Sequence, residues 1–361
     1  MRVETTMLSP ETEQYAGKGD RGVSIAGIAA AARKVEELGF DGATVPEAGH
    51  DPYLPLAIVA EHTRRIILGT NVAISFPRSP MVTAQLAWDL QQLSGGRFQL
   101  GLGTQVKGHN ERRYAAPWTA PPGPRMRDYI LCLKAMFESF QNPRNPVYFS
   151  GDHYQFTMMP PFFNPGPIEH PQIPIYLAAV NTYMARLGGE LCEGLRIHPI
   201  STFRHGREVL LPTIQEGARR AGRDLSDIDV VGSPFLAVSK DEQGLEAAKA
   251  AVKQRISFYA STRTYHSVLE FHGWSDLGAE LHRLSLEGKW REMPELISDE
   301  MLEEFAIVAI GDELAPKLRE RSEKLFTTIL LDGASALQED EEWLRATIEA
   351  LQQNQQLIGN S

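Results

Sequence analysis

Short apolar runs alternate with longer amphipathic segments along almost the whole chain, and this alternation constrains the fold most. The apolar runs predict strands at Val3–Leu8, Gly42–Pro46, Arg65–Ser75, a stretch from Phe98 that ends in Gly-Leu-Gly-Thr, Ile175–Ala179, Leu195–His198, Asp229–Val238 and Thr327–Asp332. Helical spacing predicts the segments between them as helices, at Ser24–Leu38, Pro55–His62, Met81–Leu93, Arg125–Phe140, Tyr183–Cys192, Glu208–Ala221, Glu242–Tyr259, Glu313–Lys324 and Glu341–Gln352. Because parallel strands need helical crossovers, eight strand–helix repeats favour an α/β chain closed into a (β/α)8 barrel. An open doubly wound sheet with a second domain is the alternative.

The alternation is interrupted twice. Residues 142–174 are rich in proline and aromatic residues, and we expect an excursion after the fourth strand with a short hairpin near Tyr148–Phe156. Residues 260–300 form a second insertion after the seventh strand and its helix. We therefore expect one TIM-barrel domain over residues 1–361 that carries these two insertions.

Composition narrows the class of protein. Lys and Arg number 36 against 46 Asp and Glu, a net charge of −10, which disfavours broad binding to nucleic acid or to an anionic membrane. Cys132 and Cys192 are too few for a disulfide framework, and no apolar stretch resembles a signal peptide or a membrane span. The ten histidines are scattered, so no metal site is predicted. A cytoplasmic enzyme is the expectation.

The carboxyl ends of the strands are the expected site of a barrel. They select residues 47–51, 71–78, 104–111, 180–184, 198–205 and 233–235. The fourth strand is the most suggestive, because Gly101, Gly103 and Thr104 lead directly into a polar segment. Small residues there allow a ligand to approach the backbone, although a glycine after a strand is also common in a tight turn.

Three stretches, at residues 41–56, 68–105 and 174–195, resemble the bacterial luciferase-like superfamily, in particular its deazaflavin-dependent branch. The resemblance implies the (β/α)8 fold and a homodimer. It also implies an oxidoreductase that transfers a hydride between coenzyme F-420, an 8-hydroxy-5-deazaflavin, and a small organic substrate. The cofactor residues that it implies are Glu47, Asn71, Val72, Gly101, Gly103, Thr104, Ala178, Val180, Asn181, Met184, Gly188 and Gly189.

Two of these implied roles are specific. The bond between Asn71 and Val72 matches a non-prolyl cis peptide that backs the ring in this family. The helix after the fifth strand, with Met184, Gly188 and Gly189, would offer backbone N–H groups to the phosphate-bearing tail. Close helix packing is the alternative for the two glycines.

Acid–base chemistry is expected after the second strand. In the deazaflavin branch an Asp-His pair commonly follows this strand, whereas this chain has Glu47 there and His50 three residues later. We expect His50 to handle the proton, with Asp51 orienting it, and Glu47 to be the second catalytic candidate. A surface loop histidine is the alternative. The substrate-contact candidates are Lys107, His109, Arg263 and His266.

Two other functions stay open. The first is an FMN-dependent luciferase-like monooxygenase that uses reduced flavin and dioxygen. The polyglutamate tail of the deazaflavin needs a long basic groove and FMN a compact phosphate pocket, and Arg78, Lys107, Arg112 and Arg113 could serve either. The second is a barrel that binds a deazaflavin or another ligand without turning it over.

Overall fold

A closed barrel of eight parallel strands forms the centre of the computed structural model, which describes residues 1–7, 25–332 and 335–353. Its strands are β1 (Arg2–Thr6), β2 (Gly42–Val45), β3 (Ile67–Thr70), β5 (Phe98–Gly103), β8 (Ile175–Ala179), β9 (Gly194–Ile197), β10 (Asp229–Gly232) and β13 (Thr328–Leu330). Pairing of β3 with β5 and of β13 with both β1 and β10 closes the ring. The predicted (β/α)8 fold is confirmed. Two predicted element ends, Leu8 and Ser24, lie outside the described residues.

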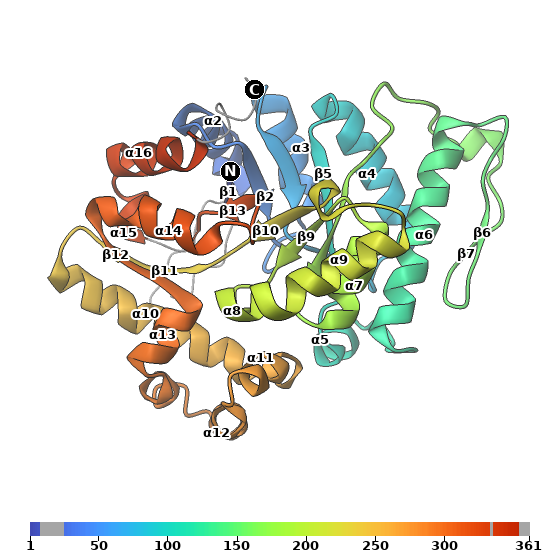
Figure 1. The fold of residues 1–361 in the computed structure, drawn as a ribbon. Helices are drawn as coiled ribbons and strands as arrows, with labels where there is room; N and C mark the ends of the chain where they lie inside the picture. The colour runs from blue at the N-terminus through green and yellow to red at the C-terminus, as the bar shows by residue number, and fades with distance from the viewer. Residues whose placement is uncertain (8–24, 333–334, 354–361) are drawn as a thin grey trace.

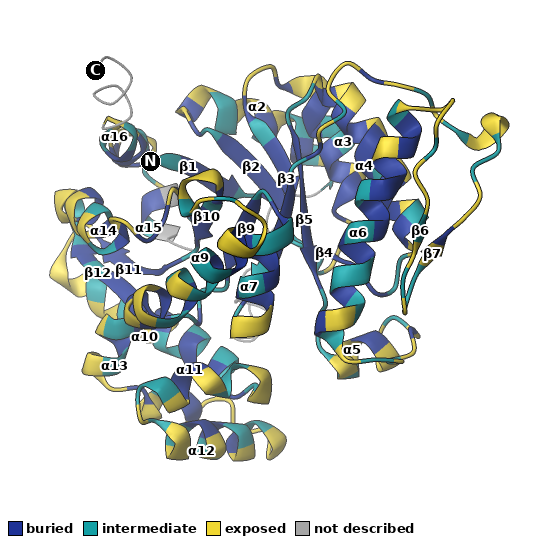
Figure 2. Ribbon diagram, turned by 45° about the vertical axis from the view of Figure 1, so that its right-hand side comes forward, coloured by how far each residue is buried: buried dark blue, intermediate teal, exposed yellow. Residues whose placement is uncertain are grey.

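Helices surround the barrel and connect its strands (Figure 1). They are α2 (Ile28–Leu38), α3 (Tyr53–His62), α4 (Pro80–Ser94), α6 (Pro122–Gln141), α7 (Thr182–Leu191), α9 (Leu211–Arg220), α14 (Leu314–Ser322) and α16 (Glu341–Gln352). Shorter helices are α5 (Lys107–Arg112), α8 (Phe203–His205), which continues through a π-helical turn into α9, and α15 (Ser335–Gln338). Figure 2 shows that the barrel strands are buried while the outer helix faces are exposed.

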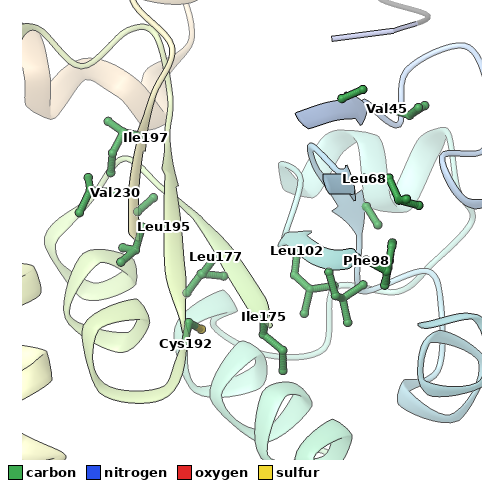
Figure 3. Close-up of a cluster of buried hydrophobic side chains, with 14 of the residues drawn as sticks. Val45, Leu68, Phe98, Leu102, Ile175, Leu177, Cys192, Leu195, Ile197 and Val230 are labelled. Atoms are coloured by element: carbon green, nitrogen blue, oxygen red, sulfur yellow. The ribbon is translucent and has the colours of Figure 1, made fainter. Parts of the chain in front are cut away.

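The main core lies between the barrel and these helices. In β8, Ile175 and Leu177 are fully buried and belong to this core, and Figure 3 shows Leu177 next to Leu195 of β9, with which it pairs. The residue between them, Tyr176, has the opposite orientation, because its hydroxyl bonds to Gln99 and Asp229 inside the barrel. This alternation decides which residues of each strand face the barrel axis.

The third strand departs from its prediction. The range Arg65–Ser75 divides into β3 and a separate two-residue strand, β4 (Ala73–Ile74). The junction between them is the Asn71–Val72 peptide bond, which is cis, as the resemblance implied. β4 still pairs with β5, so the chain passes the junction and returns to the barrel wall.

The predicted seventh strand, Asp229–Val238, is also two strands. β10 ends at Gly232, and after Ser233 and Pro234 the chain enters β11 (Phe235–Ser239). Proline has no N–H for a ladder hydrogen bond, which accounts for the break. β11 leaves the barrel and pairs in parallel with β12 (Ala306–Ile310), a strand that the sequence analysis did not predict.

The two insertions differ in structure. Residues 142–174 contain the predicted hairpin, with β6 (Phe149–Ser150) paired to β7 (Gln155–Phe156) outside α6, and a 3-10 turn at Pro161–Phe163.

The second insertion follows α10 (Glu242–Ala260) and is helical, with α11 (His266–Phe271), α12 (Ser275–Leu286) and α13 (Asp299–Phe305). It packs with α10 and β11–β12 around a second hydrophobic cluster. Within the described residues, no helix is both apolar enough and long enough to span a membrane.

Candidate functional site

The carboxyl ends of the parallel strands meet at one end of the barrel, here called the mouth. α5, α8 and the helices α11 and α12 of the second insertion lie toward this end, in the lower part of Figure 1. Asn71 at the end of β3 is partly exposed, and its N–H donates to the carbonyl oxygen of Val45 on β2, at 2.9 Å. Val72, which follows, is also partly exposed.

Gly101 and Gly103 make room for the neighbouring strand. A Cβ atom on Gly101 would overlap the carbonyl oxygen of Thr70, and one on Gly103 would lie 2.6 Å from Cγ2 of Val72. The hydroxyl of Thr70 also donates to the carbonyl of Gly101, at 2.6 Å. The glycines therefore admit the backbone around Asn71 and Val72, and it is Val72 rather than bare glycine backbone that covers this part of the wall.

Glu47 is held in an ion-pair network. Its carboxylate accepts from the N–H of Ile74, at 2.7 Å, and from Arg78, at 2.6 Å, and its side chain is only 5% exposed. The two carboxylates of Glu47 and Asp51 raise the pKa of Arg78 above its ordinary value against the opposing effect of burial. This arrangement makes Glu47 a residue that positions β4, with its carboxylate engaged by Arg78.

His50 lies apart from this network. It is exposed and makes no hydrogen bond with any residue in the described part of the chain. Asp51, expected to orient it, instead accepts from the N–H groups of Tyr53 and Leu54 at the start of α3 and from Arg78. The expectation that Asp51 orients His50 is wrong, because the carboxylate is used in these contacts.

The segment after β5 is a short helix beside the mouth rather than an open loop. Asn110 is buried and donates to the carbonyl of Thr104 at 2.9 Å, and Arg113 donates to the carbonyl of Ala48. Lys107 and His109 remain exposed on α5, with the Lys107 ammonium 3.8 Å from Glu111. Their positive and polar groups stay accessible to a ligand.

β8, which pairs with β5, and the helix α7 form the adjacent part of the mouth. Ala178 and Val180 are partly exposed at the end of β8. Asn181 caps α7, because its side-chain oxygen accepts from the N–H of Met184 at 2.9 Å. The Met184 amide is therefore already bonded, and the first amides of the helix, at Thr182 and Tyr183, have no partner within it. They are the groups that would receive an anion.

Gly188 and Gly189 do not lie at this helix end. They belong to the last turns of α7 and are buried. A Cβ on Gly188 would lie 2.6 Å from the side chain of Leu195, and one on Gly189 would overlap the carbonyl oxygen of Ile214 on α9. Their predicted role as phosphate donors is corrected to close packing, since amides inside a helix already donate along it.

The second insertion brings Tyr265 to the mouth, a residue that was not among the four substrate-contact candidates. Arg263 is exposed, and His266 packs beside His282 within the insertion, with 6.4 Å between the ring centroids. Tyr265, which lies between them in sequence, instead contacts His198 at the end of β9, with 4.7 Å between the rings.

The strand-end rule reached His198 within residues 198–205 but gave it no role, and the sequence analysis missed the polar interior of the barrel. Arg196 on β9 pairs with Glu4 on β1 at 2.8 Å, and the two side chains are 4% and 1% exposed. The signal was a charged residue inside an apolar strand. Since Arg196 faces inward, His198 two residues later shares its face, and that parity could have identified it.

The residues at the mouth fit a planar, anionic cofactor. Val72, Ala178 and Val180 offer small apolar walls, and the start of α7 offers free amides. Within the described residues, no group of three or more His, Cys, Asp or Glu side chains gathers as a metal site would require.

Comparison with known proteins agrees with this architecture. The profile of the luciferase-like monooxygenase family matches residues 4–328. An uncharacterized protein of Mycobacterium tuberculosis is 42% identical over 315 residues, which cover 87% of this chain and 92% of that protein. The 5,10-methylenetetrahydromethanopterin reductase of Archaeoglobus fulgidus is 28% identical over 302 residues, covering 82% and 86%.

Among solved structures, the coenzyme F-420 dependent tetrahydromethanopterin reductase of Methanopyrus kandleri superposes with a TM-score of 0.75 at 21% identity. The match covers 97% of this chain and 96% of that one. The sequence profile matches residues 4–328, and the superposed fold covers 97% of the chain. The chain therefore belongs to the luciferase-like monooxygenase family of oxidoreductases.

Proposed function

We propose that the protein transfers a hydride between coenzyme F-420 and a small organic substrate at the barrel mouth. The observation that carries the proposal is the pairing of an apolar wall with a helix start: Val72, Ala178 and Val180 stand beside the free first amides of α7. The kinship with a methylenetetrahydromethanopterin reductase supports it, since that relative matches 82% of the chain.

The residues of the mouth would divide the binding of such a cofactor between them. Val72, Ala178 and Val180 would contact the ring, and Asn181 would hold the α7 start in place for a phosphate. The exposed Lys107 and Arg112 on α5 would attract an anionic tail. When bound, the deazaflavin supplies the carbon that gives or takes the hydride, and the protein positions it and excludes water.

Titration of the purified chain with coenzyme F-420 tests this proposal through quenching of the deazaflavin fluorescence. We expect saturable quenching that weakens at least tenfold in Ala178→Leu, because the added side chain fills the ring wall. Ala250→Leu, on an exposed face of α10, is the matched control and should bind as the wild type does. Absence of saturable quenching in the wild type contradicts the proposal.

An FMN-dependent monooxygenase is the second candidate, and the description of the matching family favours it. The tail distinguishes the two, since FMN ends in a single phosphate. Lys107→Gln combined with Arg112→Gln should weaken the binding of coenzyme F-420 while leaving the binding of FMN nearly unchanged. Tight retention of FMN without any quenching of the deazaflavin would decide for the monooxygenase.

The non-catalytic ligand-binding barrel was an alternative, and kinship with oxidoreductases speaks against it. It would gain support only if replacing His50 and Glu47 with alanine left every measured rate unchanged. Two expectations stay predictions. The homodimer is testable by sedimentation equilibrium. The cytoplasmic location is testable by fractionation of the cells that produce the protein.

A further inference from the structure

His198 occupies a defined place at the mouth. It follows β9 directly, and Arg196, two residues earlier, points to the barrel axis where it meets Glu4. Successive residues of a strand face opposite sides, so His198 continues the inward column of Arg196 at the level of the strand ends. Its backbone N–H donates to the carbonyl of Ala179 on β8, at 3.4 Å, which ties the residue to the neighbouring strand end.

Aromatic side chains from the second insertion enclose the His198 ring. The ring of Tyr259, near the end of α10, contacts the imidazole edge-on, with 4.8 Å between the ring centroids. The ring of Tyr265 is tilted against the imidazole, with a centroid separation of 4.7 Å. Val180 at the end of β8 packs against the same hydrophobic cluster as both tyrosines. Two strand ends and the insertion thus build one apolar wall around a single imidazole.

The hydrogen bonds of the ring decide which nitrogen carries the proton. The N–H of Ile200 donates to Nδ1 of His198 at 3.1 Å, so Nδ1 must present its lone pair. In the neutral ring the proton then lies on Nε2. In the described part of the chain Nε2 has no hydrogen-bond partner, and the residue keeps part of its surface accessible.

The ring is held neutral by its surroundings. Burial lowers the pKa of His198 to about 3, and no neighbouring charge contributes to this shift. At neutral pH the side chain therefore offers a hydrogen bond and no charge. A carboxylate or phosphate placed against it would lose hydration without gaining a countercharge, which is costly in an apolar wall.

We propose that Nε2–H of His198 donates a hydrogen bond to a neutral oxygen or nitrogen acceptor of the substrate, while Tyr259 and Tyr265 contact an apolar or aromatic part beside it. The substrate class is then an uncharged carbonyl, imine or similar compound. This inference rests on the proposed function in one respect, because it takes the barrel mouth as the substrate site.

Binding of three probes of similar shape to the full-length protein tests the inference. Acetophenone carries a neutral acceptor, ethylbenzene has none, and benzoate carries a charge. Dissociation constants are measured by ligand-observed NMR, with and without coenzyme F-420. We expect benzoate to bind at least tenfold more weakly than acetophenone.

Variants of the wall isolate the hydrogen bond from the packing. His198→Phe should raise the dissociation constant of acetophenone about tenfold or more, and it should change the dissociation constant of ethylbenzene less than about twofold. His198→Gln, which retains a donor, should recover most of the acetophenone affinity. Tyr265→Ala should weaken both neutral probes alike. Thermal unfolding of each variant checks that it folds. If His198→Phe does not fold, the comparison rests on His198→Gln.

The outcomes separate this inference from the proposed function. Acetophenone binding that is unchanged in His198→Phe, or benzoate binding as tight as acetophenone, overturns the role of His198. Acetophenone selectivity that depends on His198, in a protein that does not quench coenzyme F-420, supports the inference and contradicts the proposed cofactor.

Discussion

Gly101 has no room for a side chain, because the carbonyl oxygen of Thr70 occupies the space where a Cβ would stand. Gly101→Ala should therefore lower the free energy of unfolding by about 1–3 kcal/mol, as forced overpacking does. Gly49→Ala is the control, since a Cβ there meets nothing within 4 Å. Urea unfolding of both variants measures the difference. Equal midpoints would show that the strand relaxes freely at this point.

Replacing Glu47 should also lower the stability of the protein. Glu47→Gln removes the negative partner of Arg78 and weakens the acceptor for the N–H of Ile74, so β4 should lose its anchor. We expect about 1.5–3 kcal/mol less stability, the range for hydrogen bonds to charged groups. Glu341→Gln, whose partner Lys34 is exposed, should lower the stability less, because water screens an exposed ion pair. Chemical denaturation compares them, and similar losses would contradict the anchoring role.

At the element scale, α8 and the end of α11 meet through one histidine. Nδ1 of His272 accepts from Arg204 at 2.5 Å, so the proton of the neutral ring lies on Nε2, which donates to the hydroxyl of Thr202 at 2.7 Å. Burial, followed by the charge of Arg204, lowers the pKa of His272 to about 4. Protonation would place a second charge against Arg204, so this contact between barrel and insertion requires the neutral ring.

The stability of this region should therefore depend on pH. A histidine whose folded pKa is lowered binds more protons unfolded, so stability rises with pH from about 4 to the ordinary value near 6.5 and is lost as pH falls through that window. His198 and His205, with pKa values lowered to about 3 and about 4, act in the same direction.

Each such group contributes at most about 1.4 kcal/mol per pH unit, and the partly exposed His272 contributes less because water screens it. Thermal midpoints at pH 7 and pH 5 measure the effect. His272→Gln should show a smaller drop than the wild type. An identical drop in both proteins would mean that His272 does not titrate in this window.

For the whole molecule, the Glu4–Arg196 pair links two strands that are 192 residues apart in sequence and lie across the barrel. Both side chains are almost fully buried. Glu4→Gln should cost about 3–5 kcal/mol, because it leaves the Arg196 charge unpaired inside the protein.

The double variant Glu4→Met with Arg196→Met provides the control for this pair. It should be less destabilised than Glu4→Gln, since replacing both charges removes the desolvation cost along with the attraction. Equilibrium unfolding in urea measures both. A double variant that is less stable than Glu4→Gln would show that the ion pair contributes more to stability than the removal of both charges restores.

Local patterns sufficed for most of the fold. Apolar runs located the barrel strands and helical spacing located their helices, because both patterns depend on residues that are close in sequence. They did not divide Asp229–Val238 at Pro234 or find β12, since apolar runs such as Ala306–Ile310 do not reveal which sheet they join.

The candidate site was predictable only in outline. The strand-end rule and the resemblance reached Asn71, Val72 and Val180. They also assigned Gly188 and Gly189 to a phosphate, because sequence does not show which amides a helix leaves free. The proton-handling role of His50 stays a prediction.

The sequence by itself determined the eight strand–helix repeats, the two insertions and the family, since these follow from patterns within short stretches of chain. Only the tertiary structure decided that Glu47 is held by Arg78 and that Tyr265 of an insertion meets His198 of the barrel. Those contacts join residues tens of positions apart, and their geometry exists only once the barrel has closed and the insertion has packed onto its mouth.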